Sequence, residues 1–285
     1  FLDALGGDLD QLEAALAADD ARPTVHLVAR PGRITAAELA DRIGAVQAKY
    51  SPFGVYLDAG DPARLTPIRS GSAAVQDEGS QLAAAAFAQA PIDGPDRNWV
   101  DLCAGPGGKA SLLAAIGVER GATLTAIEPA EHRAKLVMQA LAGFDATTIV
   151  ADGRQPPLPA GSADRVLVDA PCSGLGALRR RPEARWRRQP SDLPALTTLQ
   201  RELLASALEL VRPGGIVGFV TCSPHLAETR QIVRQVAKGH ELIDVRPLLP
   251  GVPDIGDGPW VQLWPHLHGT DAMFIALIRR VGEQL

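Results

Sequence analysis

Residues 98–110 read NWVDLCAGPGGKA, and this stretch decides the fold that the sequence predicts. It begins as a short apolar strand ending at Asp101, continues through a glycine turn, and enters a helix over residues 111–116. Glycine suits such a turn because the backbone must bend tightly and a ligand must approach it without a Cβ in the way. The helix that follows directs its free N–H groups toward whatever occupies the turn. The pattern therefore predicts a nucleotide site.

Three kinds of glycine loop could occupy this position. A phosphate-binding P-loop, G-x-x-x-x-G-K-[ST], fails twice, because Cys103 and Ala110 stand where it needs its first glycine and its final Ser or Thr. Residues 105–110 do match the dinucleotide pattern G-x-G-x-x-G/A. A third possibility is S-adenosylmethionine, which the same strand, loop and helix can hold. Residues 123–127 form the next strand and Glu128 follows it, and this acid suits the ribose diol of either cofactor.

Composition limits the class of protein. The 285 residues are 46% hydrophobic and 21% charged, with a formal net charge of −5, so a nucleic-acid partner would have to meet a local basic patch. Three cysteines without a C-x-x-C pair argue against a metal site or a disulfide framework and favour a reducing, cytoplasmic setting. No apolar run reaches the ~18 residues that a membrane span needs. We expect a monomer and, because the chain opens on Phe1 rather than Met, a fragment of a longer protein.

Residues 1–70 are predicted to form a small α+β N-terminal subdomain. Its expected elements are a helix over residues 9–18, a strand over 24–30, a helix over 35–48 and a strand over 54–57. Thr35 can cap the second helix, with Glu38 three residues later.

Residues 71–285 are predicted to be the catalytic domain. Strands at 147–150, 165–168 and 215–220 alternate with helices at 131–141 and 196–211, a pattern that predicts an α/β fold with a parallel, doubly wound sheet. Ligands bind such sheets at the carboxyl ends of the strands. Four acids fall at those ends, namely Asp101, Glu128, Asp152 and Asp169.

Two cysteines also follow strands of this sheet. Cys172 comes after the strand at 165–168 and Cys222 after the strand at 215–220, and each is followed by serine. Free cysteine is most often a small buried hydrophobe, which we expect for Cys103. Strand ends face the ligand crevice, however, and cysteine is a strong nucleophile near neutral pH. The other two thiols therefore indicate nucleophilic chemistry.

With these motifs the chain resembles the NOL1/NOP2/Sun family of RNA cytosine-5 methyltransferases, and within it the bacterial 16S ribosomal RNA enzymes. The resemblance covers about residues 20–280 and selects S-adenosylmethionine over a dinucleotide. The stretches that carry it, in the order of the family, are Val75 to Glu78, Asp101 to Lys109, Asp169 to Gly174 followed by Leu178 to Pro182, Thr221 to Ser223, Leu263 to His266, and His268 to Asp271.

The resemblance implies a Rossmann-like class I methyltransferase fold and a covalent mechanism. Carbon 5 of cytosine becomes nucleophilic once a thiolate has added to carbon 6; by resemblance Cys222 is that nucleophile and Cys172 assists release of the product. Asp169 would stabilise the protonated cytosine ring or orient the amine of the cofactor. The implied cofactor contacts are Cys103, Ala104, Gly105, Pro106, Gly107, Gly108 and Lys109 for the methionine portion and ribose, Glu128 for the ribose diol, and Asp152 for the adenine amino group.

Lys109 has two interpretations. It could raise the thiolate fraction of a nearby cysteine, or it could be a solvated lysine at the start of a helix. Glu128 stands where the family more often has aspartate, which lengthens the ribose contact without removing it.

Six arginines lie within residues 179–188 of this otherwise acidic chain. A charge run is usually a solvated face, but this run follows a cysteine motif and contains a tryptophan that could stack on a base. We therefore expect RNA, most simply ribosomal RNA, to contact Arg179, Arg180, Arg181, Arg185 and Trp186. We also expect the N-terminal subdomain to contact RNA. No metal is expected, because His266 and His268 have no partner at ligand spacing.

Two other classes of function remain open. A dinucleotide oxidoreductase would explain the glycine loop and Glu128, but it leaves the two Cys-Ser strand ends without a role. A non-catalytic RNA-binding or ribosome assembly factor would explain the arginines, but both cysteines of the catalytic motifs are intact.

Overall fold

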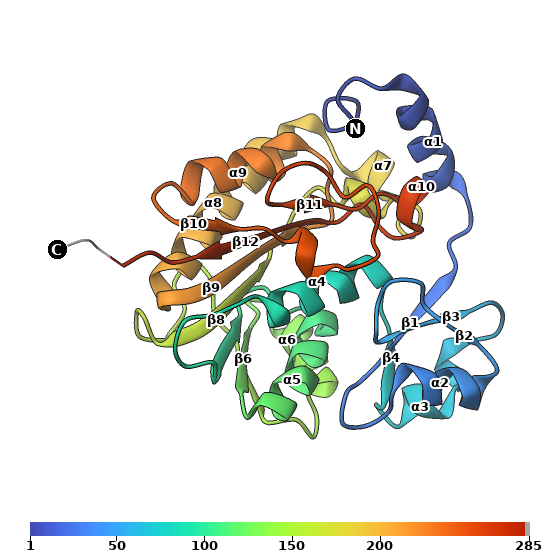
Figure 1. Ribbon diagram of the computed structural model, residues 1–285, viewed down its shortest axis with the longest axis horizontal. Helices are drawn as coiled ribbons and strands as arrows, with labels where there is room; N and C mark the ends of the chain where they lie inside the picture. Colours follow the sequence, from blue (N-terminus) through green and yellow to red (C-terminus); the bar gives the residue numbers. More distant parts are fainter. Residues whose placement is uncertain (283–285) are drawn as a thin grey trace.

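A computed structural model of the chain describes residues 1–282 and contains two separate β-sheets (Figure 1). The larger sheet holds the predicted strand-loop-helix at its centre. Its strands lie in the spatial order β10 (Glu241–Ile243), β12 (Phe274–Arg279), β9 (Val211–Thr221), β8 (Ala163–Asp169), β5 (Asn98–Asp101), β6 (Thr123–Ile127) and β7 (Ala146–Ile149), and β11 (Val261–Gln262) pairs with β12. The five strands from β9 to β7 are parallel, whereas β12 runs antiparallel to β9 and β10.

Helices cover both faces of this sheet, as a doubly wound fold requires. One face carries α4 (Glu78–Gln89), α5 (Gly108–Arg120) and α6 (Glu131–Ala140), and the other carries α8 (Leu193–Leu210) and α9 (Arg230–Val236). Successive residues of a strand point to opposite faces, so along β8 Leu167 packs into the α4 and α5 core while Val166 and Val168 pack into the α8 core. These strands are apolar on both faces, which is typical of a parallel sheet covered by helices. The predicted α/β fold is confirmed.

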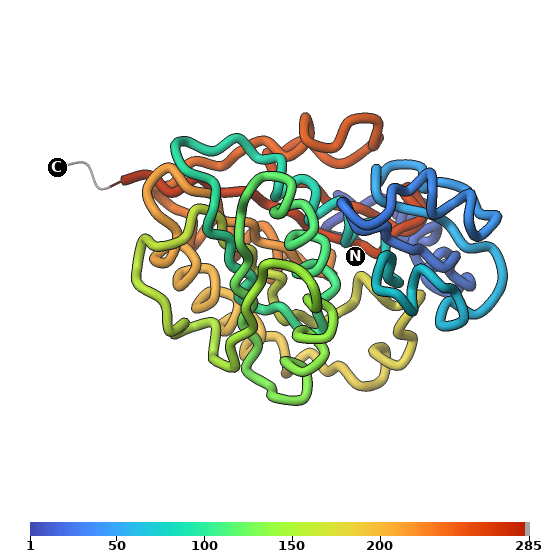
Figure 2. The backbone as a smooth tube through the Cα atoms, turned by 90° about the horizontal axis from the view of Figure 1, so that it is seen from below, coloured from blue at the N-terminus to red at the C-terminus, as the bar shows by residue number. Residues whose placement is uncertain are grey.

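The smaller sheet is antiparallel and lies in the N-terminal part of the chain. Its order is β2 (Val46–Gln47), β3 (Gly54–Leu57), β1 (Val25–Ala29) and β4 (Ala73–Val75), and α2 (Ala36–Ile43) and α3 (Thr66–Arg69) accompany it. Figure 2 shows this unit, blue to cyan, to one side of the rest of the chain. Strand β4 follows the predicted boundary at residue 70 yet pairs with β1. The division at residue 70 stays a prediction.

Helix α2 has the predicted start but not the predicted end. Thr35 accepts a bond from the Glu38 N–H, and the Glu38 carboxylate accepts one from the Thr35 N–H, which completes the capping box. The helix ends at Ile43 rather than Ala48 because Gly44 adopts a left-handed conformation with φ of 64°. Glycine favours this conformation, so it terminates the helix.

The N-terminal helix α1 (Leu9–Asp20) contacts a helix near the other end of the chain. It packs against α10 (Pro265–His268), and His266 Nε2 lies 2.8 Å from the Gln11 side-chain oxygen. Near the other end of α1, Asp20 pairs with Arg185 of α7 (Ala184–Arg187) at 2.7 Å. Helix α1 therefore lies beside the arginine-rich segment.

Candidate active site

The carboxyl ends of the parallel strands bring the predicted site residues to one edge of the large sheet. Strands β5, β8 and β9 are neighbours in register, with Asp101 opposite Leu167 and Asp169 opposite Val220. The glycine loop, the Cys172 loop and the Cys222 loop leave these three strands at the same edge, as expected for a doubly wound sheet.

The glycine loop and Glu128 are packed against each other. Glu128 is about 1% exposed, and its two oxygens accept from the N–H groups of Gly105 and Ala130 at 3.1 Å each. A Cβ on Gly105 would overlap a Glu128 oxygen, and Gly107 has a φ of 108° and faces α6. Both glycines are therefore required by the local geometry. Arg133, at 3.4 Å from Glu128, also donates to the Gly105 carbonyl.

Asp101, at the end of β5, is a buried carboxyl group with one oxygen that has no partner. Its Oδ1 accepts from the Cys103 N–H at 3.2 Å, whereas Oδ2 is buried without a hydrogen bond. Burial, together with repulsion from Asp169, raises the pKa of Asp101 to about 7. The strand-end position of Asp101 was evident in the sequence, but its role as an unsatisfied acceptor was not.

Lys109 is buried and forms an ion pair with Asp169. Its Nζ lies 2.8 Å from the Asp169 Oδ2, and its side chain is only 8% exposed. Burial alone would lower the pKa of Lys109, but the contact with Asp169 raises it above its usual value. The side chain therefore stays in the ammonium form. The alternative of a solvated lysine at the helix start is wrong.

The two cysteines that follow strands are brought together. The Cys172 and Cys222 sulfurs are 3.5 Å apart, and both residues are free thiols. A hydrogen bond from Cys172, assisted by the charge of Lys109, lowers the pKa of Cys222, whereas the same bond and burial raise the pKa of Cys172 well above its usual range. The thiolate is therefore favoured at Cys222 and the thiol at Cys172.

The third cysteine is set apart from this pair. Cys103 lies in the glycine loop, packs against the α8 core, and has its pKa raised by burial and by Asp101. This environment suits an inert thiol.

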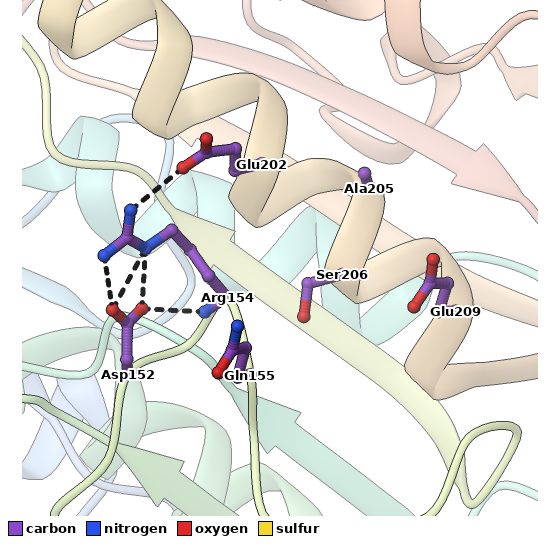
Figure 3. A pocket seen from close by; sticks show the side chains of 7 residues that line it. All are labelled: Asp152, Arg154, Gln155, Glu202, Ala205, Ser206 and Glu209. Carbon is purple, nitrogen blue, oxygen red and sulfur yellow. Dashed lines mark hydrogen bonds and ion pairs between the residues drawn. The ribbon is translucent and has the colours of Figure 1, made fainter.

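Asp152 lies at the edge of the site, after β7, where it is about half exposed. Its carboxylate accepts from the Arg154 guanidinium, which also reaches Glu202 of α8 at 3.0 Å. Figure 3 shows these side chains around an open pocket of about 480 Å³. Its contact with an adenine amino group stays a prediction.

The arginine-rich segment divides into buried and exposed parts. Arg179 is 6% exposed and donates to the carboxylates of Asp77 and Asp271 at 2.6 and 3.2 Å, and Arg180 also pairs with Asp271. Both carboxylates are buried, so Arg179 satisfies them and has no free face for a phosphate. Arg179 is therefore occupied by internal ion pairs, and its contact with RNA stays a prediction.

Farther along the segment the side chains are accessible. Trp186 is 72% exposed, and Arg181 and Arg187 are also exposed. Arg185 pairs with Asp20, while Arg188 donates to the Ser173 carbonyl at 3.2 Å. The exposed part of the segment is thus continuous with the Cys172 loop.

Residues 1–282 contain neither a cluster of metal-ligating side chains nor a membrane-spanning helix. No group of three or more His, Cys, Asp or Glu side chains there is placed to hold a metal ion. None of the helices in that range combines the length and the apolar character needed to cross a membrane.

A family comparison identifies this arrangement. The model of the 16S rRNA methyltransferase RsmB/F family matches residues 90–279, about two thirds of the chain. The chain belongs to the RsmB/F family. Membership confirms the resemblance and the predicted methyltransferase class, with S-adenosylmethionine as its cofactor, in place of a dinucleotide oxidoreductase. The matched RsmB/F residues include the glycine loop, both cysteine loops and the arginine-rich segment.

Curated relatives of this RsmB/F chain extend the match toward the N-terminus. A Mycobacterium tuberculosis protein named as a methyltransferase is 58% identical over 284 residues, which are 99% of this chain and 62% of that protein. The ribosomal RNA small subunit methyltransferase B of Pseudomonas putida is 35% identical over 236 residues, 79% of this chain and 53% of that enzyme. The chain thus spans little more than half the length of these relatives.

Solved structures share the RsmB/F fold. The crystal structure of PH0851 is 26% identical, has a TM-score of 0.86, and covers 98% of this chain, which in turn covers 65% of it. NSun6 from Pyrococcus horikoshii, solved with SFG, is 18% identical with a TM-score of 0.82, and the coverage is 99% of this chain and 97% of that one. At 18% identity, the similarity to NSun6 shows the fold alone.

Proposed function

We propose that the protein transfers a methyl group from S-adenosylmethionine to carbon 5 of a cytosine in RNA, with 16S ribosomal RNA as the substrate class. The observation that carries the proposal is the pair of thiols 3.5 Å apart at the strand ends beside the glycine loop. The family model and the name of the Pseudomonas putida relative support ribosomal RNA as the substrate.

The residues at the strand ends fit S-adenosylmethionine. The unpartnered Asp101 Oδ2 is an acceptor suited to an ammonium group, and a buried acceptor without a partner is costly unless a ligand satisfies it. Each Glu128 oxygen accepts one backbone bond and has a second lone pair for a ribose hydroxyl. Gly105 and Gly107 have no room for a Cβ. When bound, the cofactor would supply an electrophilic methyl group.

Lys109 and Cys222 would act together on the cytosine ring. The Lys109 ammonium lowers the pKa of Cys222 in addition to the bond from Cys172, so a thiolate is available to add to carbon 6. Addition places negative charge on the pyrimidine ring, and carbon 5 then becomes the nucleophile. Asp169, paired with Lys109, would stabilise the protonated cytosine ring or orient the amine of the cofactor.

Cys172 would keep its proton while Cys222 reacts. Its pKa lies well above the usual range because it donates to Cys222 and is buried. After methyl transfer a base takes the carbon 5 proton, and the electron pair of that C–H bond re-forms the double bond between carbons 5 and 6. The bond between sulfur and carbon 6 breaks in the same step, and Cys222 departs as a thiolate. A thiol at 3.5 Å stabilises this leaving group by hydrogen bonding, which would assist release of the product.

RNA would meet the exposed part of the arginine-rich segment. Trp186 can stack on a base, and Arg181 and Arg187 can contact phosphates. The segment follows the Cys172 loop directly, so an RNA strand bound there leads to the thiols. The N-terminal α+β unit is proposed to contribute a second RNA contact.

The test uses RNA that contains 5-fluorocytidine, from which the mechanism cannot eliminate a proton. The wild-type chain with S-adenosylmethionine should form an adduct that resists denaturation, and Cys222→Ala should form none. Cys172→Ala should form the adduct and, because release is slowed, should also retain it on ordinary cytidine RNA. RNA with 5-fluorouridine is the matched control. An adduct that persists in Cys222→Ala would overturn the assignment.

A further inference from the structure

A fully buried carboxylate, Glu228, lies between the two cysteine loops and has no part in the chemistry above. It belongs to the 3-10 turn Leu226–Glu228, which follows β9, and its side chain is 0% exposed. A carboxylate is rarely buried to this extent unless its oxygens are fully bonded. Its bonds therefore show what it holds in place.

Four donors reach the two oxygens of Glu228. Oε1 accepts from the Ser173 N–H at 2.7 Å and from the Gln200 side chain at 3.1 Å. Oε2 accepts from the hydroxyls of Ser173 at 2.5 Å and Ser223 at 2.7 Å. Four donors fill the acceptor capacity that an ionised carboxylate commonly uses. The two serine hydroxyls lie 3.2 Å from each other.

The two serines are the residues that directly follow Cys172 and Cys222. The loops come from different strands, β8 and β9, and are 50 residues apart in sequence. One carboxylate bonds both serines, and each serine is joined to its cysteine by a single peptide unit. The carboxylate therefore fixes the positions of the two cysteine Cα atoms. The same group thus sets the approach of the sulfurs to 3.5 Å.

Further bonds make this arrangement asymmetric. The Cys172 loop donates a backbone N–H and a hydroxyl to Glu228, and Gln200 also donates to the Pro171 carbonyl at 2.9 Å. The Cys222 loop donates a hydroxyl alone. The pKa of Cys172 is raised first by its bond to Cys222, then by burial and by the charge of Cys222, and after these by the charge of Glu228. On the other side of the pair, Lys109 acts on Cys222.

We propose that Glu228 is a positioning residue that ties the two cysteine loops together and assigns the thiol role to Cys172 and the thiolate role to Cys222. Only the catalytic consequence of these two roles, in methyl transfer, rests on the proposed function. The difference between the two sulfurs is a property of the free protein.

Two kinds of variant separate the charge of Glu228 from its bonds. In Glu228→Gln the amide oxygen can keep the two Oε1 bonds, and the amide N–H groups can donate to the serine hydroxyls, so the charge is lost while the tie remains. In the double variant Ser173→Ala, Ser223→Ala the charge remains while both hydroxyl bonds are lost. Glu119→Gln, at an exposed position near the end of α5, is the matched control.

The readout is the rate at which each cysteine reacts with iodoacetamide as a function of pH, without cofactor or RNA, followed by peptide mass spectrometry. In the wild type Cys222 should react faster than Cys172. Glu228→Gln should speed Cys172 about tenfold near neutral pH, because a pKa lower by one unit raises the thiolate fraction tenfold. The double serine variant should slow Cys222 by about as much, because the bond from Cys172 is loosened.

A ratio of the two rates that equals the wild-type ratio in both folded variants would overturn the proposal, because a merely structural carboxylate would alter stability and not selectivity. If Glu228→Gln does not fold, the double serine variant decides alone. Methyl transfer by Glu228→Gln should fall in kcat with KM for RNA unchanged, and Glu228→Asp should recover part of the rate. If the alkylation rates shift as expected but no adduct forms with 5-fluorocytidine RNA, the proposed function is rejected and the role of Glu228 is retained.

Discussion

Replacing Asp101 by asparagine should stabilise the free protein at alkaline pH. The wild-type carboxyl is about 1% exposed and has one oxygen without a partner, and its pKa rises from 3.8 to about 7 on folding, chiefly through burial. Above that pH the folded chain carries a desolvated charge that the unfolded chain exposes to water. Asparagine removes the charge and keeps the oxygen that the Cys103 N–H uses.

The magnitude follows from proton linkage. Because the folded pKa is the higher one, the folded state binds more protons than the unfolded state in the window between the two values. The contribution to stability is fully present below the unfolded pKa and is lost as pH rises through the folded pKa. The complete loss is roughly 4 kcal/mol, of which about half is already incurred near pH 5.5. An unpartnered amide in the variant costs roughly 1–3 kcal/mol at any pH.

The pH dependence of the difference therefore isolates the carboxyl group. The free energy of unfolding of Asp101→Asn minus that of the wild type should increase by about 2 kcal/mol between about pH 5.5 and pH 8.5, measured by urea denaturation without cofactor. Asp145→Asn, at an exposed position, is the control and should show a flat difference. A flat difference for Asp101→Asn would refute the reasoning. Calorimetry should also show S-adenosylmethionine binding weakened about tenfold or more, because the acceptor charge is lost.

Three other perturbations test separate parts of the site. Lys109→Met should move the pH midpoint of Cys222 alkylation upward and slow the reaction about tenfold near neutral pH; an unmoved midpoint would show that the ammonium does not act on the thiol. Gly105→Ala should destabilise the protein by roughly 1–3 kcal/mol in urea denaturation, because the new Cβ would overlap a carboxylate oxygen. In the control Gly108→Ala, the nearest neighbour of the new Cβ would be 3.8 Å away, so this variant should unfold at nearly the same urea concentration as the wild type. Trp186→Ala should weaken RNA binding about tenfold by fluorescence anisotropy through loss of base stacking and leave cofactor binding unchanged; equal RNA affinity would remove Trp186 from the interface.

The parts of the fold that local pattern controls could be predicted from the sequence. The strand and glycine loop over residues 98–108 were predicted because apolar residues, a terminal acid and a glycine turn are adjacent in the chain. The predicted end of α2 is five residues too late, although Gly44 marks the true end, because the apolar periodicity continues past that glycine. At this position the left-handed glycine ends the helix even though the apolar periodicity continues.

The partners of buried polar groups could not be predicted in this way. Glu228 binds a serine 5 residues away and another 55 residues away, and no spacing rule in one sequence connects them. The proximity of Cys172 and Cys222 could be inferred, because strand ends of a parallel sheet share an edge. The carboxylate that ties the loops following those strands depends on how the turn after β9 packs, which only the structure shows.

The arginine-rich segment shows how burial assigns different roles to the same residue type. Arg179 bridges Asp77 and Asp271, which are 102 and 92 residues away in sequence, and all three side chains are buried. Breaking a buried network by removing one charge typically costs about 3–5 kcal/mol, because the partners stay buried and unpaired. Exposed arginines such as Arg181 carry no such penalty and can exchange water for phosphate. A segment anchored by its buried end and exposed at its other end can therefore present Trp186 to RNA while keeping the Cys172 loop in place.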